Sequence, residues 1–126
     1  MTDEALGSRR WTIPGGHVPL ESTGPEPAMV SHERLCVLNT GAEMVTITVR
    51  LSYASGRDAG PYHLTVAPRR VRHVRINDLI DPYAPPLGAA YAIDLESTEP
   101  VVVQWSRQDT GRRTRALCSS LGMPLE

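Results

Sequence analysis

The chain has 126 residues, which suits one domain that buries a hydrophobic core without a metal or a disulfide to hold it together. Its net charge of -1 at pH 7 gives no general attraction to nucleic acid or to an anionic membrane, so either kind of binding would need a local patch. Phe is absent and only 5% of the residues are aromatic, so we expect a core of Val, Leu and Ile.

The N-terminal segment carries no sign of export or membrane insertion. Residues 1–15 include Asp3 and Glu4 and contain no apolar run of signal-peptide length. We therefore expect a cytoplasmic protein with one domain over residues 1–126 and a flexible N-terminus over residues 1–9. Cys36 and Cys118 lie in apolar segments without CxxC spacing, which favours buried free thiols and leaves a bridge between them as the alternative.

Strand patterns recur along the whole chain. The clearest covers residues 44–54, where apolar side chains from Val45 to Tyr53 alternate with Thr, Arg and Ser, as in a strand buried on one face. Shorter runs of β-branched residues bounded by turn residues predict further strands. These lie at residues 10–13, 34–39, 62–66, 70–76, 91–97, 101–107 and 115–121.

Turn residues separate these strands at 39–41, 55–61, 81–86 and 99–100. None of the gaps is long enough for the helix of a repeated βαβ unit. The sequence therefore predicts an all-β fold, an antiparallel β-sandwich of jelly-roll type with about eight strands. Two loops, residues 15–31 and 77–88, are longer and more polar than a simple connection needs, and long ordered loops often carry function.

Two segments hold polar residues suited to a binding site. Ser31, His32 and Glu33 precede a predicted strand, and residues 69–78 read RRVRHVRIND. In an extended segment His73, Arg75 and Asn77 would point to one face, because side chains alternate along a strand. That face is either the floor of a polar pocket or an outer surface in contact with water.

The sequence gives weaker support to a metal site or an enzyme. His32, Glu33, His73 and Asp78 are suitable metal ligands, but adjacent His and Glu in a strand point to opposite faces and no HxH or HExxH pattern occurs. The sequence also lacks a nucleophile elbow, a P-loop and a dinucleotide-binding glycine motif. We therefore expect a protein that is not an enzyme and has no metal or cofactor, with a metal-dependent enzyme as a minor alternative.

All 13 basic residues are Arg, and two clusters stand out. Each could clamp a phosphate or carboxylate, contact DNA, or form salt bridges at a subunit interface, where a symmetric oligomer would bring several copies together. The clusters are Arg69, Arg70, Arg72 and Arg75, and Arg107, Arg112, Arg113 and Arg115.

Seven blocks in one order resemble the Anabaena sensory rhodopsin transducer family. They are WTIPG at 11–15, GPEP at 24–27, SHERLCVLN at 31–39, GPYHLTV at 60–66, RR at 69–70, HVRINDL at 73–79 and VVVQ at 101–104. The resemblance covers residues 10–121, with segment 108–115 less similar to the family.

This resemblance implies a soluble homotetrameric β-sandwich of the kind that, in the namesake system, docks on the cytoplasmic side of a light-sensing rhodopsin. The corresponding partner expected for this chain is a membrane photoreceptor or another receptor. The resemblance also implies a small sugar- or nucleotide-like ligand, or DNA, as a partner. A signalling or ligand-binding module is therefore the leading expectation, and a DNA-binding transcription-associated regulator is the alternative. The residues expected to form the ligand site are His32, Glu33, Arg70, His73, Arg75, Asn77 and Asp78.

Overall fold

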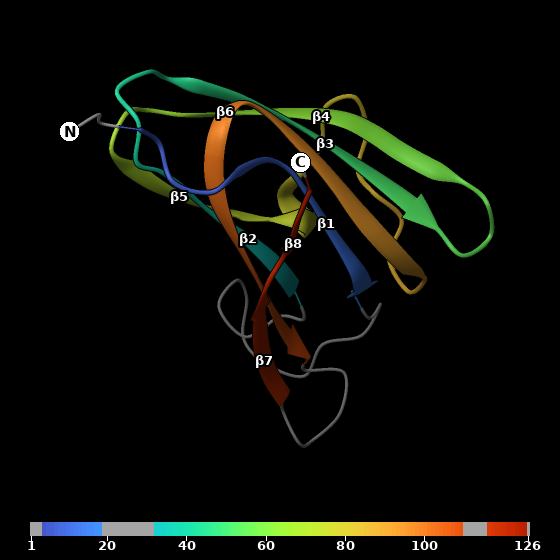
Figure 1. Cartoon of the computed structure of the whole chain (residues 1–126). Helices are drawn as coiled ribbons and strands as arrows, with labels where there is room; N and C mark the ends of the chain where they lie inside the picture. Colours follow the sequence, from blue (N-terminus) through green and yellow to red (C-terminus); the bar gives the residue numbers. More distant parts are fainter. Residues whose placement is uncertain (1–3, 19–31, 110–115, 126) are drawn as a thin grey trace.

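A computed structural model describes residues 4–18, 32–109 and 116–125 of the chain (Figure 1). Residues 1–3, 19–31, 110–115 and 126 are outside this description, as are the side chains at 109 and 116–118. The described residues form eight strands and one short 3-10 helix. In chain order these are β1 (Ser8–His17), β2 (His32–Asn39), β3 (Val45–Tyr53), β4 (Asp58–Val66), β5 (Arg70–Arg75), η1 (Ile76–Asp78), β6 (Ala90–Asp109), β7 (Ala116–Leu121) and β8 (Met123–Leu125).

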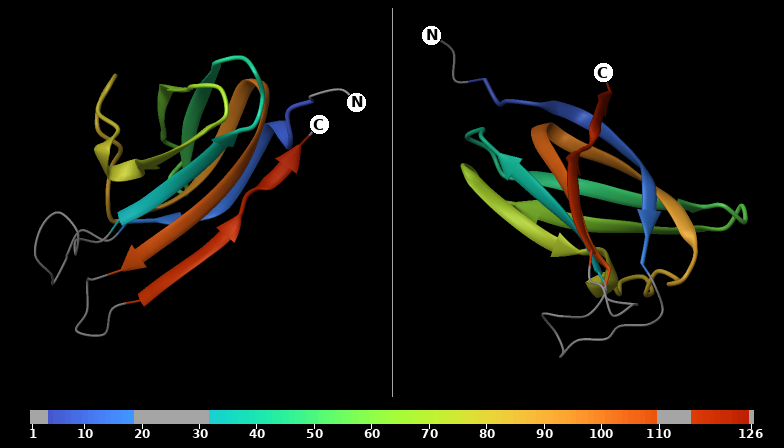
Figure 2. Two further views of the ribbon diagram at one scale, coloured as in Figure 1. Left: turned by 90° about the vertical axis from the view of Figure 1, so that its left-hand side faces the viewer. Right: turned by 90° about the horizontal axis from the view of Figure 1, so that it is seen from below.

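The strands pack as two layers that share β6. Its first half pairs with β1 and β3, giving the order β4-β3-β6-β1-β8, and its second half lies between β2 and β7, with β5 on the far side of β2. All pairs are antiparallel. The eight strands therefore form one continuous sheet that folds over into a sandwich (Figures 1 and 2), and the predicted all-β antiparallel fold is confirmed.

Strand β6 corrects the sequence-based expectation of two strands separated at Glu99-Pro100. It is one strand of 20 residues. Its pairing with β3 ends at Ser97 and its pairing with β2 begins at Val102. Proline has no N–H to donate to a ladder, and Pro100 lies where β6 changes partners, so the missing donor interrupts neither ladder.

Strand β4 corrects a second boundary, because Gly60-Pro61 was expected to belong to a turn and lies within the strand. It faces the irregular register between Val49 and Leu51 on β3. Gly60 has a φ of +102°, and a Cβ there would lie 2.9 Å from the Val49 carbonyl oxygen. Glycine is therefore required at this position by both conformation and space. Strand β8 was not predicted, since three residues are too few for an alternation pattern.

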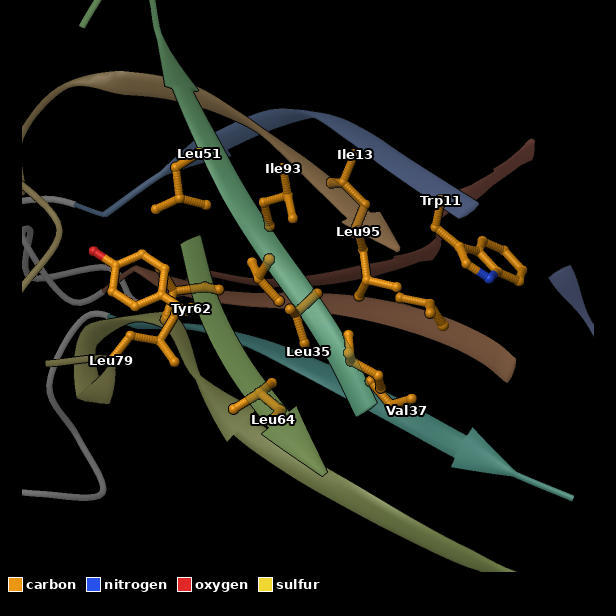
Figure 3. Packing of buried hydrophobic residues seen from close by; sticks show 14 of the residues in the cluster. Trp11, Ile13, Leu35, Val37, Leu51, Tyr62, Leu64, Leu79, Ile93 and Leu95 are labelled. Carbon is orange, nitrogen blue, oxygen red and sulfur yellow. The ribbon is translucent and has the colours of Figure 1, made fainter. Parts of the chain in front are cut away.

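The core lies between the two layers and consists mainly of aliphatic side chains, as expected. Leu35 and Val37 of β2, Leu51 of β3, and Ile93 and Leu95 of β6 are at most 1% exposed and point into this space (Figure 3). Burying each such side chain stabilises the fold by about 1.5–3 kcal/mol.

The N-terminus and the cysteines differ in part from the sequence-based expectation. Strand β1 starts at Ser8, so it includes the last two residues of the segment 1–9 that was expected to be flexible. The Leu6 N–H also donates to Thr40 Oγ1 at 2.7 Å. Cys36 is a free thiol, as predicted, but it is half-buried and not buried. The Cys118 side chain lies outside the described residues.

Candidate functional site

Glu33 is a carboxylate inside the sandwich. It is the second residue of β2 and is 0% exposed, on the same face of the strand as Leu35 and Val37. The alternation of β2 places it there, because inward positions recur at every second residue. A buried carboxylate is costly unless it is paired and hydrogen-bonded, so its partners decide what it does.

Four donors surround this carboxylate. The Tyr91 hydroxyl and Trp105 Nε1, at 3.2 Å, donate to Oε1, while Arg107 Nε at 2.9 Å and the His17 backbone N–H at 2.6 Å donate to Oε2. The donors come from β1 and from both halves of β6. We call these five residues the Glu33 cluster. It connects the two layers and leaves neither carboxylate oxygen unsatisfied.

Two members of the cluster are held in place by further contacts. Arg107 occupies the position paired with Glu33, its Nη2 donates to the Gly15 carbonyl oxygen at 2.7 Å, and its guanidinium lies 5.2 Å from the Trp105 ring centroid. Burial, and then the negative charge of Glu33, raise the pKa of Tyr91. The Tyr91 hydroxyl therefore keeps its proton and acts as a hydrogen-bond donor.

Asn77 reaches the start of β2, and this corrects the expectation that it continues the row of His73 and Arg75. The strand ends at Arg75 and the chain turns into η1, so the alternation of side chains stops there. The Glu33 N–H instead donates to Asn77 Oδ1 at 3.4 Å. His32, opposite Gln108 on β6, is also buried at 8% exposure.

A shallow groove of about 460 Å³ runs along β5, and we call it the β5 groove. Because consecutive residues 72–75 all line it, it follows the edge of the strand rather than one face. The Arg72 Nη1 donates to the Thr65 carbonyl oxygen of β4 at 2.9 Å, which bridges the two layers here. The lining residues are Arg34, Leu64, Arg72, His73, Val74, Arg75, Asp78 and Leu79.

Six of the seven predicted site residues fall into two adjoining groups and one outlier, and the seventh, His32, is buried opposite Gln108 and does not line the groove. Glu33 and Asn77 are joined by a partly buried hydrogen bond, and His73, Arg75 and Asp78 line the β5 groove. Arg70 stands apart, since its Nη1 donates to the carbonyl oxygens of Pro68 and Arg69 at 3.4 and 3.3 Å. The two groups are joined through the chain, because Glu33 precedes Arg34 and Asn77 precedes Asp78.

Several residues of the candidate site were not among the predicted site residues. Arg34 and Arg72 line the groove. Arg72 had been noted as part of an arginine cluster, and the adjacency of Arg34 to Glu33 was the signal that could have found Arg34. Arg107 had been noted only as part of an arginine cluster, whose other members lie outside the described residues. No pattern in the nearby sequence pointed to Tyr91, Trp105 or His17, because long-range strand pairing brings them to Glu33.

Two further properties bear on chemistry. Within residues 4–18, 32–109 and 116–125, no three His, Cys, Asp or Glu side chains lie close enough together to hold a metal ion. The same residues include no helix long and apolar enough to cross a membrane.

The fold and the site define a small antiparallel β-sandwich that is tied together by a buried carboxylate and carries an arginine-lined groove at one sheet edge. The family model of the Anabaena sensory rhodopsin transducer matches residues 6–124. The chain belongs to this family.

Two solved structures are similar over most of the chain. The Anabaena sensory rhodopsin transducer is 40% identical, with 80% of this chain and 97% of that chain covered and a TM-score of 0.73. Thermotoga maritima 1070 is 32% identical, with 95% of this chain and 97% of that chain covered and a TM-score of 0.82. No curated protein sequence gives a significant match.

Proposed function

We propose that the chain is a signalling module that binds a small polar ligand in the β5 groove and contacts a receptor. The observation that carries this proposal is the convergence of His73, Arg75 and Asp78 on one groove. These side chains offer donors and an acceptor beside the apolar surface of Val74 and Leu79, which is the usual composition of a small-molecule site.

The connection between groove and interior suggests how a bound ligand could affect the rest of the molecule. Arg34 and Asp78 line the groove. Their sequence neighbours Glu33 and Asn77 precede them in the chain and are joined by a hydrogen bond. Glu33 is in turn bound to donors on β1 and β6. A ligand that moves Arg34 or Asp78 would therefore act on residues that hold the two layers together.

The receptor proposal rests on the family. One similar structure is that of the Anabaena sensory rhodopsin transducer. A membrane photoreceptor or another receptor is the corresponding partner for this chain, with the contact made in the cytoplasm. We also propose the homotetramer that the resemblance implies. Two exposed apolar side chains at paired positions on the outer face of β5 and β2, Val71 and Leu38, support an interface there.

Thermal unfolding against sugars, sugar acids and nucleotides tests the ligand site, because a ligand of the native state raises stability by RT ln(1 + [L]/Kd). We expect one class to raise the Tm and His73→Ala to abolish the shift. His63→Ala is the matched control, because His63 is an exposed strand histidine outside the β5 groove. An equal shift in the parent and His73→Ala would contradict the proposed site.

Binding of DNA is the second candidate function. It is favoured by Arg69, Arg70 and Arg72, three exposed arginines at one sheet edge. Neutralising phosphates releases counterions, so affinity for a DNA duplex would fall steeply with salt and Arg70→Gln would reduce the slope. A flat anisotropy titration at low salt would remove this candidate.

A further inference from the structure

The β5 groove has a charge opposite to that of the whole chain. Its lining includes Arg34, Arg72 and Arg75 against one carboxylate, Asp78, while the chain carries a net charge of -1. Positive charge concentrated in a concave surface attracts anions more strongly than the same charge spread over a convex one. The local composition therefore favours a negatively charged ligand.

Arg34 is the most informative residue of the groove. Its side chain is half-buried, and its Nε is buried with no hydrogen-bond acceptor among the described residues. Within that part of the chain no carboxylate pairs with it, unlike Arg107, whose Nε lies 2.9 Å from Glu33 Oε2. A guanidinium stays charged at every physiological pH, and buried charges are normally paired. The Arg34 Nε is thus a buried donor that an acceptor bound at this place would satisfy.

Protection of a sheet edge does not explain this arrangement. Charged side chains on an edge strand commonly prevent pairing with another chain, and that reason suffices for Arg70 and Arg72 on β5. Arg34 lies on β2, which has β5 on one side and β6 on the other. It therefore has no exposed edge to protect, and its place beside Arg75 at a paired position points to shared binding.

We infer that the β5 groove binds a small metabolite that carries a phosphate or carboxylate group and a hydroxyl group. Arg34 and Arg75 hold the anionic group, because guanidinium groups match the geometry of both oxyanions. The Arg72 side chain is held at the groove by its hydrogen bond to the Thr65 carbonyl oxygen. Asp78 accepts from the hydroxyl. This inference rests on the proposed ligand site and names the class of ligand.

Isothermal titration at fixed ionic strength tests the inference with three probes that share a hexose ring, namely glucose 6-phosphate, glucuronate and glucose. We expect at least one of the two anions to bind about tenfold or more tightly than glucose, because a charge-assisted hydrogen bond to a guanidinium contributes about that factor. Glucose binding as tightly as both anions would overturn the inference.

Substitution of Arg34 is the second arm. We expect Arg34→Gln to weaken anion binding at least tenfold and Arg34→Lys, which keeps the charge, to retain part of the affinity. Arg50→Gln is the matched control, because Arg50 is an exposed arginine on β3 outside the groove. Circular dichroism confirms that each variant is folded. Unchanged anion affinity in Arg34→Gln, or an equal loss in Arg50→Gln, would overturn the assignment.

The outcomes separate this inference from the proposed function. Binding of a neutral sugar that depends on His73 but not on Arg34 would leave the ligand site standing and overturn the anion assignment. Absence of binding by all three probes would overturn the anion assignment, and absence of a thermal shift across the wider ligand panel would remove the ligand site as well.

Discussion

Arg107 Nε lies 2.9 Å from Glu33 Oε2, and the two residues occupy paired positions on β6 and β2. This ion pair is the centre of the Glu33 cluster. The Glu33 side chain is 0% exposed and that of Arg107 is 27% exposed, so solvent screens the pair much less than a surface pair. The cluster is therefore a structural element that also borders the β5 groove, through Arg34.

Removal of the Glu33 charge should destabilise the protein strongly. Glu33→Gln leaves the Arg107 guanidinium without its carboxylate, and breaking a buried pair by removing one partner costs about 3–5 kcal/mol. Glu99→Gln is the matched control, because the Arg9–Glu99 pair is exposed, with side chains 61% and 46% accessible. Its loss should be about 1 kcal/mol or less. Urea denaturation measures the unfolding free energy of both variants. Similar decreases in this free energy for the two variants would contradict the structural role of Glu33.

Two adjacent glycines should respond differently to substitution. A Cβ on Gly16 would lie 2.5 Å from the Tyr91 ring, whereas a Cβ on Gly15 would meet no atom within 4 Å. Tyr91 cannot move away without losing its bond to Glu33. Gly16→Ala should therefore cost about 1–3 kcal/mol, as overpacking does, and Gly15→Ala should cost much less. Equal unfolding free energies of the two variants would contradict this packing.

Alkaline pH should weaken the fold through Tyr53. Burial, and then the neighbouring Tyr62, raise the pKa of Tyr53 to about 12. The unfolded chain releases this proton near its ordinary pKa of about 10, so the folded state binds more protons between the two values and its stability falls as pH rises. Below pH 10 both states are protonated and the full contribution is present.

Tyr53→Phe isolates this effect. The variant loses the hydrogen bond from the Tyr53 hydroxyl to the Pro86 carbonyl oxygen, so it should be less stable than the parent at pH 8 by about 1 kcal/mol. The difference in unfolding free energy between the parent and Tyr53→Phe should narrow as pH rises from 10 to 12. Urea denaturation at each pH follows the difference, and a constant difference over this range would refute the pKa assignment.

The proposed oligomer predicts sensitivity at the outer face of β5 and β2. Val71 is 56% exposed and lies opposite Leu38, so Val71→Glu would place a charge in the proposed interface. We expect a lower mass by light scattering for this variant and an unchanged mass for Met44→Glu, which alters another exposed apolar residue, between β2 and β3. Equal masses for the parent and Val71→Glu would place any interface elsewhere.

Local patterns predicted much of the fold. The alternation from Val45 to Tyr53 matches β3, because that strand is buried on one face only. The single strand β6 was not predictable in the same way, since Pro100 is a local breaker and only long-range pairing shows that β6 changes partners there.

The candidate site was likewise predictable where its residues are close in sequence and not where long-range pairing brings them together. His73, Arg75 and Asp78 are close in sequence and were identified together, and they line one groove. Tyr91, Trp105 and Arg107 are 58, 72 and 74 residues from Glu33, and no short-range pattern links them to it. Asn77 was assigned to the wrong row because the turn at η1 does not interrupt the pattern of residue types.

The most direct test of the ligand site is an NMR titration of the labelled protein with glucose 6-phosphate, which follows each backbone N–H. We expect shifts concentrated at Arg34, residues 72–75 and Asp78, with smaller shifts at Glu33 and Asn77. Saturable shifts at these positions would locate the ligand in the β5 groove. Saturable shifts confined to other surfaces, or none up to millimolar ligand, would contradict the groove as the site of an anionic metabolite.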